Sequence, residues 1–208
     1  MKALFYTGKN ALEFCETSVP TIGEEEALIR VRYAGICGTD LSIYAGKHPR
    51  AKPPLIMGHE FSGTVEKIQS TDSRMSNGKG ISVGDKVVAE PLISCGECFA
   101  CRSGFGYVCQ NLGLYGIDAP GGFAEYVKVP IEKLYRIPEE ISLHDAALIE
   151  PIAVAVHAVR LSDCNVSDTV CVLGAGPIGL LTGIVASQTG ARQVMICEKE
   201  HTRIDIAK

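Results

Sequence analysis

The 208-residue sequence lacks an apolar run long enough to cross a bilayer, and it lacks a strong excess of charge of either sign. Its longest apolar stretch, residues 170–181, is interrupted by glycines and falls well short of the roughly 20 residues of a transmembrane helix. The N-terminal apolar run breaks too early for a signal peptide. A formal net charge of −4 gives no reason to expect a nucleic acid or an anionic membrane as partner. We therefore expect a cytoplasmic protein with neither kind of partner.

The first part of the chain has the pattern of a β-rich domain. Residues 27–34 alternate between apolar and polar, as a half-buried strand does. Residues 58–68 and 86–90 are further strand candidates, and the polar residues 70–80 predict an exposed loop. We expect one domain over residues 1–155.

The pattern changes near residue 150 to that of an α/β fold. Residues 151–161 predict a helix with Pro151 in its first turn. A strand at 169–173, a helix at 180–189 and a strand at 193–197 then form one βαβ unit. Because residues 202–208 only begin another helix, we expect residues 156–208 to be an incomplete dinucleotide-binding domain with the start of a parallel sheet.

A glycine-rich loop joins the first strand of this unit to its helix. Glycines in the order G-x-G-x-x-G after a strand and before a helix, with an acidic residue ending the next strand, form the dinucleotide fingerprint. The carboxylate of Glu198 would accept hydrogen bonds from the adenosine ribose and repel a 2′-phosphate. This favours NAD, although Lys199 and Arg203 keep NADP open. The residues expected to contact the cofactor are Gly174, Gly176, Pro177, Ile178, Gly179, Glu198 and Arg203.

Four of the nine cysteines fall within a short segment. Their spacing is Cys95-x2-Cys98-x2-Cys101-x7-Cys109, and four thiolates can close a tetrahedral shell around Zn²⁺. The ferredoxin iron–sulfur pattern needs a shorter last spacing, and disulfides need an oxidising compartment. We expect a structural zinc ion in a lobe over about residues 91–112.

Three other segments carry side chains that can bind zinc: Cys37 with Thr39, His59 with Glu60, and Glu150. Each has a simpler explanation when it is taken singly. A lone cysteine is usually a small buried hydrophobe, and the helix dipole favours a glutamate in the first turn. These residues by themselves leave open whether they form one site.

Taken together, the motifs resemble the zinc-containing medium-chain alcohol dehydrogenases, in the branch of sorbitol, threonine and sugar-alcohol dehydrogenases. The resemblance covers essentially the whole chain and implies a β-rich GroES-like catalytic domain followed by a Rossmann domain. The motifs that carry it are Gly35-Ile-Cys37-Gly-Thr39-Asp40, Pro54-Leu-Ile-Met-Gly-His59-Glu60-Phe-Ser-Gly, Val83-Gly-Asp-Lys-Val, the four-cysteine lobe, Gly121-Gly-Phe-Ala-Glu-Tyr, Ile149-Glu150-Pro and the glycine-rich loop.

The resemblance assigns roles to the first-domain residues. Cys37 and His59 match the best-fixed ligands of a catalytic zinc, and Glu60 matches a carboxylate that binds the zinc or exchanges with water. Glu150 stands where the polyol branch has a glutamate ligand, and Thr39 matches the hydroxyl that contacts the alcohol and starts a proton relay. Many relatives have a histidine where this chain has Ser42, so the proton route through water, Ser42 or the cofactor ribose stays open.

The resemblance implies two zinc ions per chain and hydride transfer between NAD and a secondary alcohol, either a polyol, a sugar alcohol or a related hydroxy compound. It also implies a dimer or tetramer for a complete enzyme. Since relatives continue beyond the first βαβ unit, we expect this chain to be a truncated form with little activity. The alternatives are a non-catalytic zinc-stabilised GroES-like binding module, with one zinc, and a zinc-free quinone reductase relative.

Overall fold

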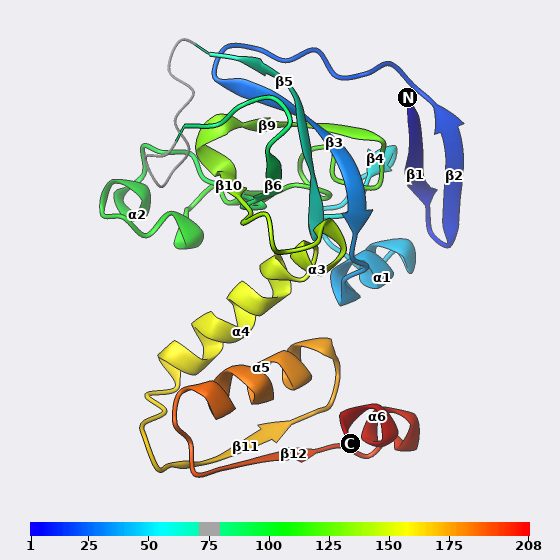
Figure 1. Cartoon of the computed structure of the whole chain (residues 1–208). Coiled ribbons are helices and arrows are strands. Elements are labelled where there is room, and N and C mark those ends of the chain that lie inside the picture. The colour runs from blue at the N-terminus through cyan, green and yellow to red at the C-terminus, as the bar shows by residue number, and fades with distance from the viewer. Residues whose placement is uncertain (71–79) are drawn as a thin grey trace. The chain divides into compact units, whose positions relative to one another are not determined.

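The computed structural model describes residues 1–70 and 80–208, and the chain forms two compact units, Met1–Leu148 and Ile149–Lys208 (Figure 1). The division falls at the start of a helix, α4 (Ile149–Leu161), while the domain boundary expected between residues 155 and 156 stays a prediction. The polar loop expected at 70–80 lies, from 71 to 79, outside the described residues.

The first unit is built mainly from antiparallel strands. Its largest sheet has five strands in the order β10-β6-β5-β3-β9, and a three-stranded sheet has the order β2-β1-β4. A two-stranded antiparallel sheet pairs β7 with β8. The strands are β1 (Lys2–Gly8), β2 (Ala11–Glu16), β3 (Glu26–Ala34), β4 (Leu55–Ile56), β5 (Phe61–Gln69), β6 (Lys86–Ala89), β7 (Leu92–Ile93), β8 (Gly113–Leu114), β9 (Tyr126–Pro130) and β10 (Leu134–Arg136).

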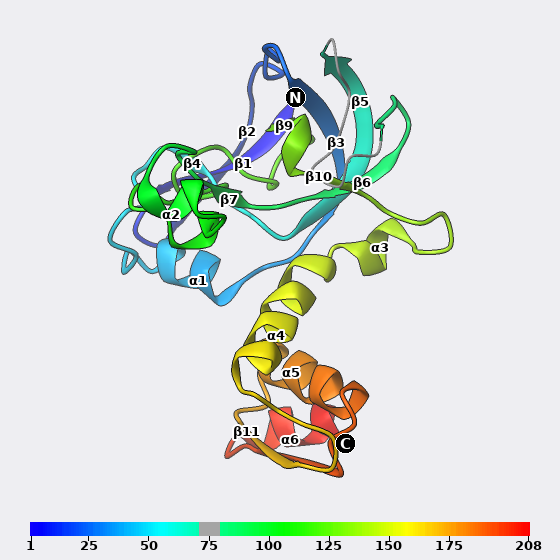
Figure 2. The same cartoon turned by 90° about the vertical axis from the view of Figure 1, so that its left-hand side faces the viewer.

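The core of this unit lies against the five-stranded sheet, whose central strands curve side by side in Figure 2. The strand expected over residues 27–34 is confirmed as β3, which pairs antiparallel with both β5 and β9. The expected half-buried alternation is not found at its start, where Ala27, Leu28 and Ile29 are all buried. Branched aliphatic side chains fill the interior because such residues pack well on a pleated surface. The most deeply buried are Ile29, Val65, Val87, Val127, Val129, Ile131 and Leu134.

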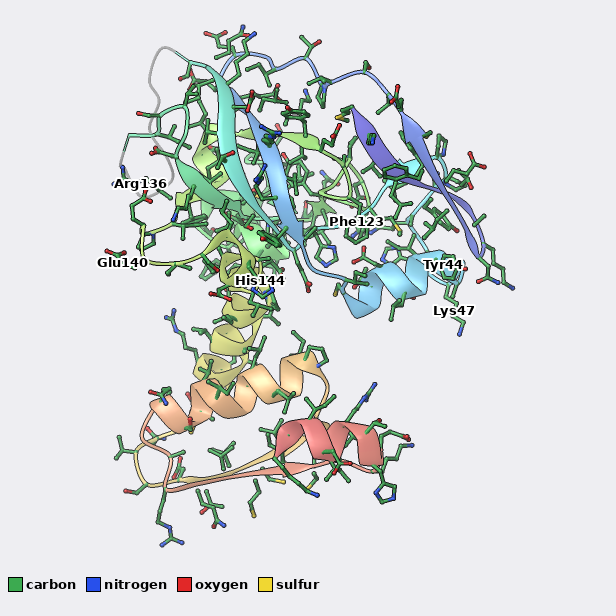
Figure 3. The ribbon with its side chains drawn as sticks, turned by 45° about the vertical axis from the view of Figure 1, so that its right-hand side comes forward. Tyr44, Lys47, Phe123, Arg136, Glu140 and His144 are labelled. Carbon is green, nitrogen blue, oxygen red and sulfur yellow. The ribbon has the colours of Figure 1, made fainter. Side chains whose placement is uncertain are left out.

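Short helices lie between the strands of the first unit and after its last strand. They are α1 (Gly38–Tyr44), α2 (Phe99–Arg102), α3 (Leu143–Ala146) and the 3-10 turns η1 (Gly106–Val108) and η2 (Ile131–Lys133). The α3 helix is held to the sheet by the Ser62 hydroxyl, which donates to the Leu143 carbonyl, and by an edge-on contact between Tyr33 and His144, 5.4 Å between ring centroids (His144 is labelled in Figure 3).

The second unit contains one βαβ motif. Strands β11 (Thr169–Leu173) and β12 (Gln193–Cys197) pair in parallel and match the predicted ranges. Helix α5 (Pro177–Gln188) begins three residues before the predicted start at Leu180, because Gly176 caps it and the fixed backbone of Pro177 suits a first helical position. A last helix, α6 (His201–Ala207), follows β12. In the described ranges no helix is long and apolar enough to span a bilayer.

Candidate metal centres

Cys37, His59 and Glu60 come together in the first unit. One ligand atom from each lies within 4.8 Å of the others. Cys37 is the extended residue before α1, and the other two directly precede β5. His59 and Glu60 are only 5% and 9% exposed, so the three donors face one another inside the fold.

The carboxylate of Asp40 joins the two segments that carry these donors. One oxygen accepts a hydrogen bond from the Cys37 backbone N–H at 2.9 Å, and the other accepts one from the Gly58 N–H at 3.3 Å. Asp40 is 2% exposed. Sequence reasoning did not single out this residue, although its place three residues after a helix cap is a local signal for the first contact. The second contact depends on the tertiary fold.

We expect Asp40→Asn to weaken zinc binding at Cys37, His59 and Glu60 by about 10–100-fold, the usual effect of losing a group that orients metal ligands. The amide keeps the size of the carboxylate but replaces one acceptor oxygen with a donor, so one backbone N–H loses its partner. A chelator competition titration measures the affinity. The matched control is Asp118→Asn in the same unit, where Asp118 accepts from the Leu114 N–H and pairs with Arg50, and an equal loss there would contradict the assignment.

Glycines allow the loop before His59 to pass close to its neighbours. Gly58 has a φ of +91°, and a Cβ on it would lie 2.5 Å from the Phe123 ring (Phe123 is labelled in Figure 3). A Cβ on Gly121 would collide with the Gly58 carbonyl. The left-handed backbone at Gly58 also explains why β5 begins at Phe61 and not at the predicted residue 58.

The electrostatics of the three donors fit a bound cation. Burial raises the pKa of the Cys37 thiol and outweighs Thr39, which lowers it. Burial also raises the pKa of the Glu60 carboxyl and outweighs the nearby His59, which lowers it. The His59 Nδ1 atom is buried and has no hydrogen-bond partner among the described residues, an arrangement that costs about 1–3 kcal/mol. A divalent ion would favour the ionised thiol and carboxylate. The residues present therefore fit a zinc ion.

The remaining predicted residues of this site lie in two places. Thr39 is in the first turn of α1, two residues after Cys37, where burial raises the pKa of the Cys37 thiol and the nearby Thr39 lowers it by less. Glu150 lies in the first turn of α4, in the second unit. Its role as a further ligand stays a prediction.

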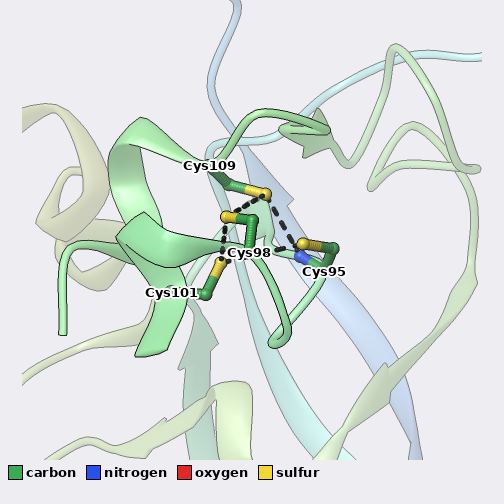
Figure 4. A group of neighbouring side chains, drawn as sticks. All are labelled: Cys95, Cys98, Cys101 and Cys109. Carbon is green, nitrogen blue, oxygen red and sulfur yellow. Dashed lines mark hydrogen bonds between the residues drawn. The ribbon is translucent and has the colours of Figure 1, made fainter. Parts of the chain in front are cut away.

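The four clustered cysteines gather around α2 and η1, with their sulfurs turned toward one another (Figure 4). The Sγ–Sγ distances are 3.4 Å for Cys98–Cys101, 3.9 Å for Cys95–Cys101 and 4.0 Å for Cys98–Cys109. Four sulfurs at about 2.3 Å from one zinc ion stand about 3.8 Å apart. The cluster already has nearly the dimensions of a filled tetrahedral site.

Backbone N–H groups prepare the cluster for thiolates. Donors at Cys101 and Gln110 lower the pKa of Cys98 to about 6, and the N–H groups of Cys95 and Asn111, each 3.3 Å from the Cys109 sulfur, lower the pKa of Cys109. Burial and the neighbouring thiols raise the pKa of Cys101 to about 12. With every position around the ion occupied by sulfur, such a site is structural.

The glycine-rich loop lies between β11 and α5, as predicted. Gly174 has a φ of +107°, and a Cβ on Gly179 would collide with the Gly174 carbonyl oxygen, so both positions require glycine. Gly176 is the N-cap of α5, Pro177 is its first residue, and Ile178 follows it and is 41% exposed. A helix N-terminus of this kind attracts phosphate.

Glu198 directly follows β12 and meets this loop. Its carboxylate accepts hydrogen bonds from the backbone N–H groups of Ala175, Lys199 and Glu200 at 2.7–3.0 Å, and Arg203 lies 3.6 Å away. These donors lower the pKa of Glu198 to about 2. The sequence did not predict that Arg203 would pair with Glu198.

Comparisons with known proteins agree with this arrangement. The profile of the alcohol dehydrogenase GroES-like domain matches residues 23–139. L-threonine 3-dehydrogenase of Bacillus subtilis is 41% identical over all of this chain and 59% of its own length. The 2-dehydro-3-deoxy-L-galactonate 5-dehydrogenase of Pseudoalteromonas atlantica is 38% identical over all of this chain and 59% of its own length. The chain thus spans about three fifths of these curated relatives.

Solved structures show the same fold. A zinc-binding dehydrogenase from Sinorhizobium meliloti, bound to NADP, superposes with a TM-score of 0.91 at 35% identity, over 99% of this chain and 58% of that one. Galactitol-1-phosphate dehydrogenase from Escherichia coli superposes with a TM-score of 0.89 at 30% identity, over 100% and 58%.

Proposed function

Because the chain belongs to the zinc-containing medium-chain alcohol dehydrogenases, in their threonine and sugar-alcohol branch, we propose that it supplies the alcohol-binding centre of an NAD-dependent dehydrogenase. The substrate class is a secondary alcohol, either a polyol, a sugar alcohol or a related hydroxy compound. We propose two zinc ions, one at Cys37, His59, Glu60 and Glu150, where Glu60 would exchange with water and so leave a position open for the alcohol, and one at the four clustered cysteines.

The observation that supports this proposal most strongly is the contrast between the two donor sets. Four cysteine sulfurs are enough to close a tetrahedral shell, whereas the other group offers one thiolate, one imidazole and one carboxylate. Catalytic zinc sites keep a position open for substrate or water. A binding module that needs zinc only for stability has no use for a second, incomplete set of ligands.

The chain's own residues would orient the alcohol and handle its proton. A zinc ion bound here would act as a Lewis acid that lowers the pKa of an alcohol hydroxyl. The Thr39 hydroxyl lies near the Cys37 sulfur, where it can accept a hydrogen bond from an alcohol held at that centre and relay the alcohol's proton by releasing its own to the next group of the relay. The apolar packing of Phe123 against the His59 loop and the hydrogen bonds of Asp40 fix the donors before substrate binds.

The second unit would bind the adenosine half of the cofactor. The N-terminus of α5 is suited to the pyrophosphate, and Glu198 is ionised at every pH well above 2. Its carboxylate can therefore accept the ribose hydroxyls. When NAD binds, the ribose hydroxyls would compete with the backbone N–H groups of Ala175, Lys199 and Glu200 for the Glu198 carboxylate. The predicted cytoplasmic location and oligomeric state stay predictions.

We expect this chain to bind ADP-ribose at least about tenfold more tightly than 2′-phospho-ADP-ribose, because a carboxylate and a phosphate about 4 Å apart near a surface repel by roughly 1–4 kcal/mol. Glu198→Gln removes the repulsion and should narrow the difference in affinity between ADP-ribose and 2′-phospho-ADP-ribose. Calorimetry measures both affinities. Asp205→Asn serves as the matched control, since it removes a carboxylate of α6 that pairs with Lys208 and leaves Glu198 and Arg203 in place. A preference unchanged by Glu198→Gln would show that another residue selects the cofactor.

Substituting cobalt for the zinc at Cys37, His59 and Glu60 tests the open position directly. We expect the cobalt absorption spectrum to change when sorbitol, xylitol or butanediol is added, since an alcohol oxygen joins the coordination shell. Cobalt at the four cysteines is the internal control and should not respond. If no alcohol in the panel alters the first spectrum, the proposed function is wrong, and the member with the tightest response identifies the substrate class.

A further inference from the structure

Gly35 and Glu60 face each other where the pairing of β3 with β5 ends. Ala34 and Phe61 are the last pair of the antiparallel register, so Gly35 and Glu60 occupy the next position along the two segments. The Gly35 backbone N–H donates a hydrogen bond to the Glu60 carbonyl at 2.7 Å. Because this bond holds the backbone of Glu60 in place, the carboxylate of Glu60 can move only through rotations of its own side chain.

The Glu60 carboxylate occupies the space that a side chain at position 35 would fill. A Cβ on Gly35 would collide with a carboxylate oxygen of Glu60 and would lie 3.2 Å from the Glu60 Cβ. The backbone of Gly35 is not in the left-handed region, so its conformation is open to other residues. What glycine provides at this position is therefore room for the carboxylate of Glu60.

A buried carboxylate that releases a metal ion needs such room inside the protein. Glu60 is 9% exposed, so its carboxylate has little access to solvent, and a buried charge without a partner is costly. The space beside Gly35 lies next to the other donors, since one ligand atom each from Cys37, His59 and Glu60 lies within 4.8 Å of the others. The carboxylate can thus leave an ion and still stay close to it.

Building on the proposed function, we propose that Gly35 is a positioning residue that keeps a place free for the Glu60 carboxylate while an alcohol occupies the zinc ion. A methyl group at position 35 would fill this place. The carboxylate would then stay on the ion, because buried charges are stable only when they are paired or bind a metal. The centre would keep its metal, and the position for the alcohol would be closed.

The test compares Gly35→Ala with the wild-type chain, both loaded with cobalt at Cys37, His59 and Glu60. We expect the variant to bind cobalt at least as tightly in a chelator competition. We expect it to need about 10–100-fold more sorbitol, xylitol or butanediol for the same spectral change, the usual size of effect for a change beside metal ligands. Gly38→Ala is the matched control, because its methyl group would meet no atom within 4 Å, and it should behave as the wild type.

A double-mutant cycle shows whether the methyl group acts through the carboxylate. Adding Gly35→Ala to a Glu60→Ala chain should change neither cobalt affinity nor the alcohol response, because the carboxylate is gone and only the Glu60 Cβ remains. An effect of the methyl group on the backbone or on folding would appear in both backgrounds, since the Cβ contact is the same in both. An equal effect in the two backgrounds would overturn the role of Gly35, as would weaker cobalt binding by Gly35→Ala.

The response of the wild-type chain separates two kinds of failure. If the wild type responds to an alcohol and Gly35→Ala responds equally, only the role of Gly35 is wrong. If the wild type responds to no alcohol, the proposed function is wrong and the role of Gly35 is wrong with it.

Discussion

Replacing Cys98 with serine should release one of the two zinc ions and unfold the segment of residues 95–109. This segment has little core of its own: α2 has no buried residue, Phe99 is 76% exposed and Val108 is 58% exposed. Structural zinc binding contributes about 10–16 kcal/mol in small zinc peptides. We therefore expect the loss to exceed about 4 kcal/mol in the free energy of unfolding of this segment, a size that single substitutions reach only through a specific mechanism such as metal loss.

Zinc content, thermal unfolding and proteolysis near Phe99 and Tyr107 measure this loss together. Cys15→Ser and Cys164→Ser are matched controls, since neither cysteine belongs to a metal-ligand group within the described residues, and each should change stability by no more than about 0.5 kcal/mol. A Cys98→Ser chain as heat-stable as its parent, with both zinc ions still bound, would refute a structural site at these cysteines.

Cys37→Ser and His59→Ala should remove the other zinc ion while the four-cysteine site stays filled. Without the ion no Lewis acid acts on the alcohol. Such an ion stabilises the charge of the transition state by several kcal/mol. In this chain we expect the cobalt response to alcohols to disappear. In a complete enzyme that carries the same substitutions, we expect hydride transfer to fall by at least about a thousandfold. Thr39→Val separates zinc binding from proton transfer, because the zinc should remain bound while proton transfer from the alcohol slows. If His59→Ala kept the alcohol response, the assignment of this centre would fail.

The sequence predicted the features that depend on neighbouring residues. The spacing of Cys95, Cys98, Cys101 and Cys109 places four sulfurs in one short segment, and the structure brings their atoms within 4.8 Å of one another. Strands β11 and β12 also follow from short apolar runs next to Gly174 and Gly190. In these segments the residues that interact are close along the chain.

Features that depend on contacts between distant segments could not be read from residue patterns. Cys37 and His59 were linked only through the family resemblance, because nothing in their spacing shows that α1 and the start of β5 meet. The hydrogen bond from the Gly58 N–H to Asp40 and the packing of Gly58 on Phe123 also join segments that are far apart in the sequence. The pairing of Arg203 with Glu198 could be recognised only from the structure, which shows how α6 lies after β12.

The measurement that tests the account most directly is the zinc content of the purified chain, determined for the wild type and for His59→Ala. An incomplete donor set beside a complete one predicts two zinc ions per wild-type chain and one in the variant. A single zinc ion in both proteins would mean that the ion sits only at the cysteines, and the chain would then be a zinc-stabilised module without a catalytic centre.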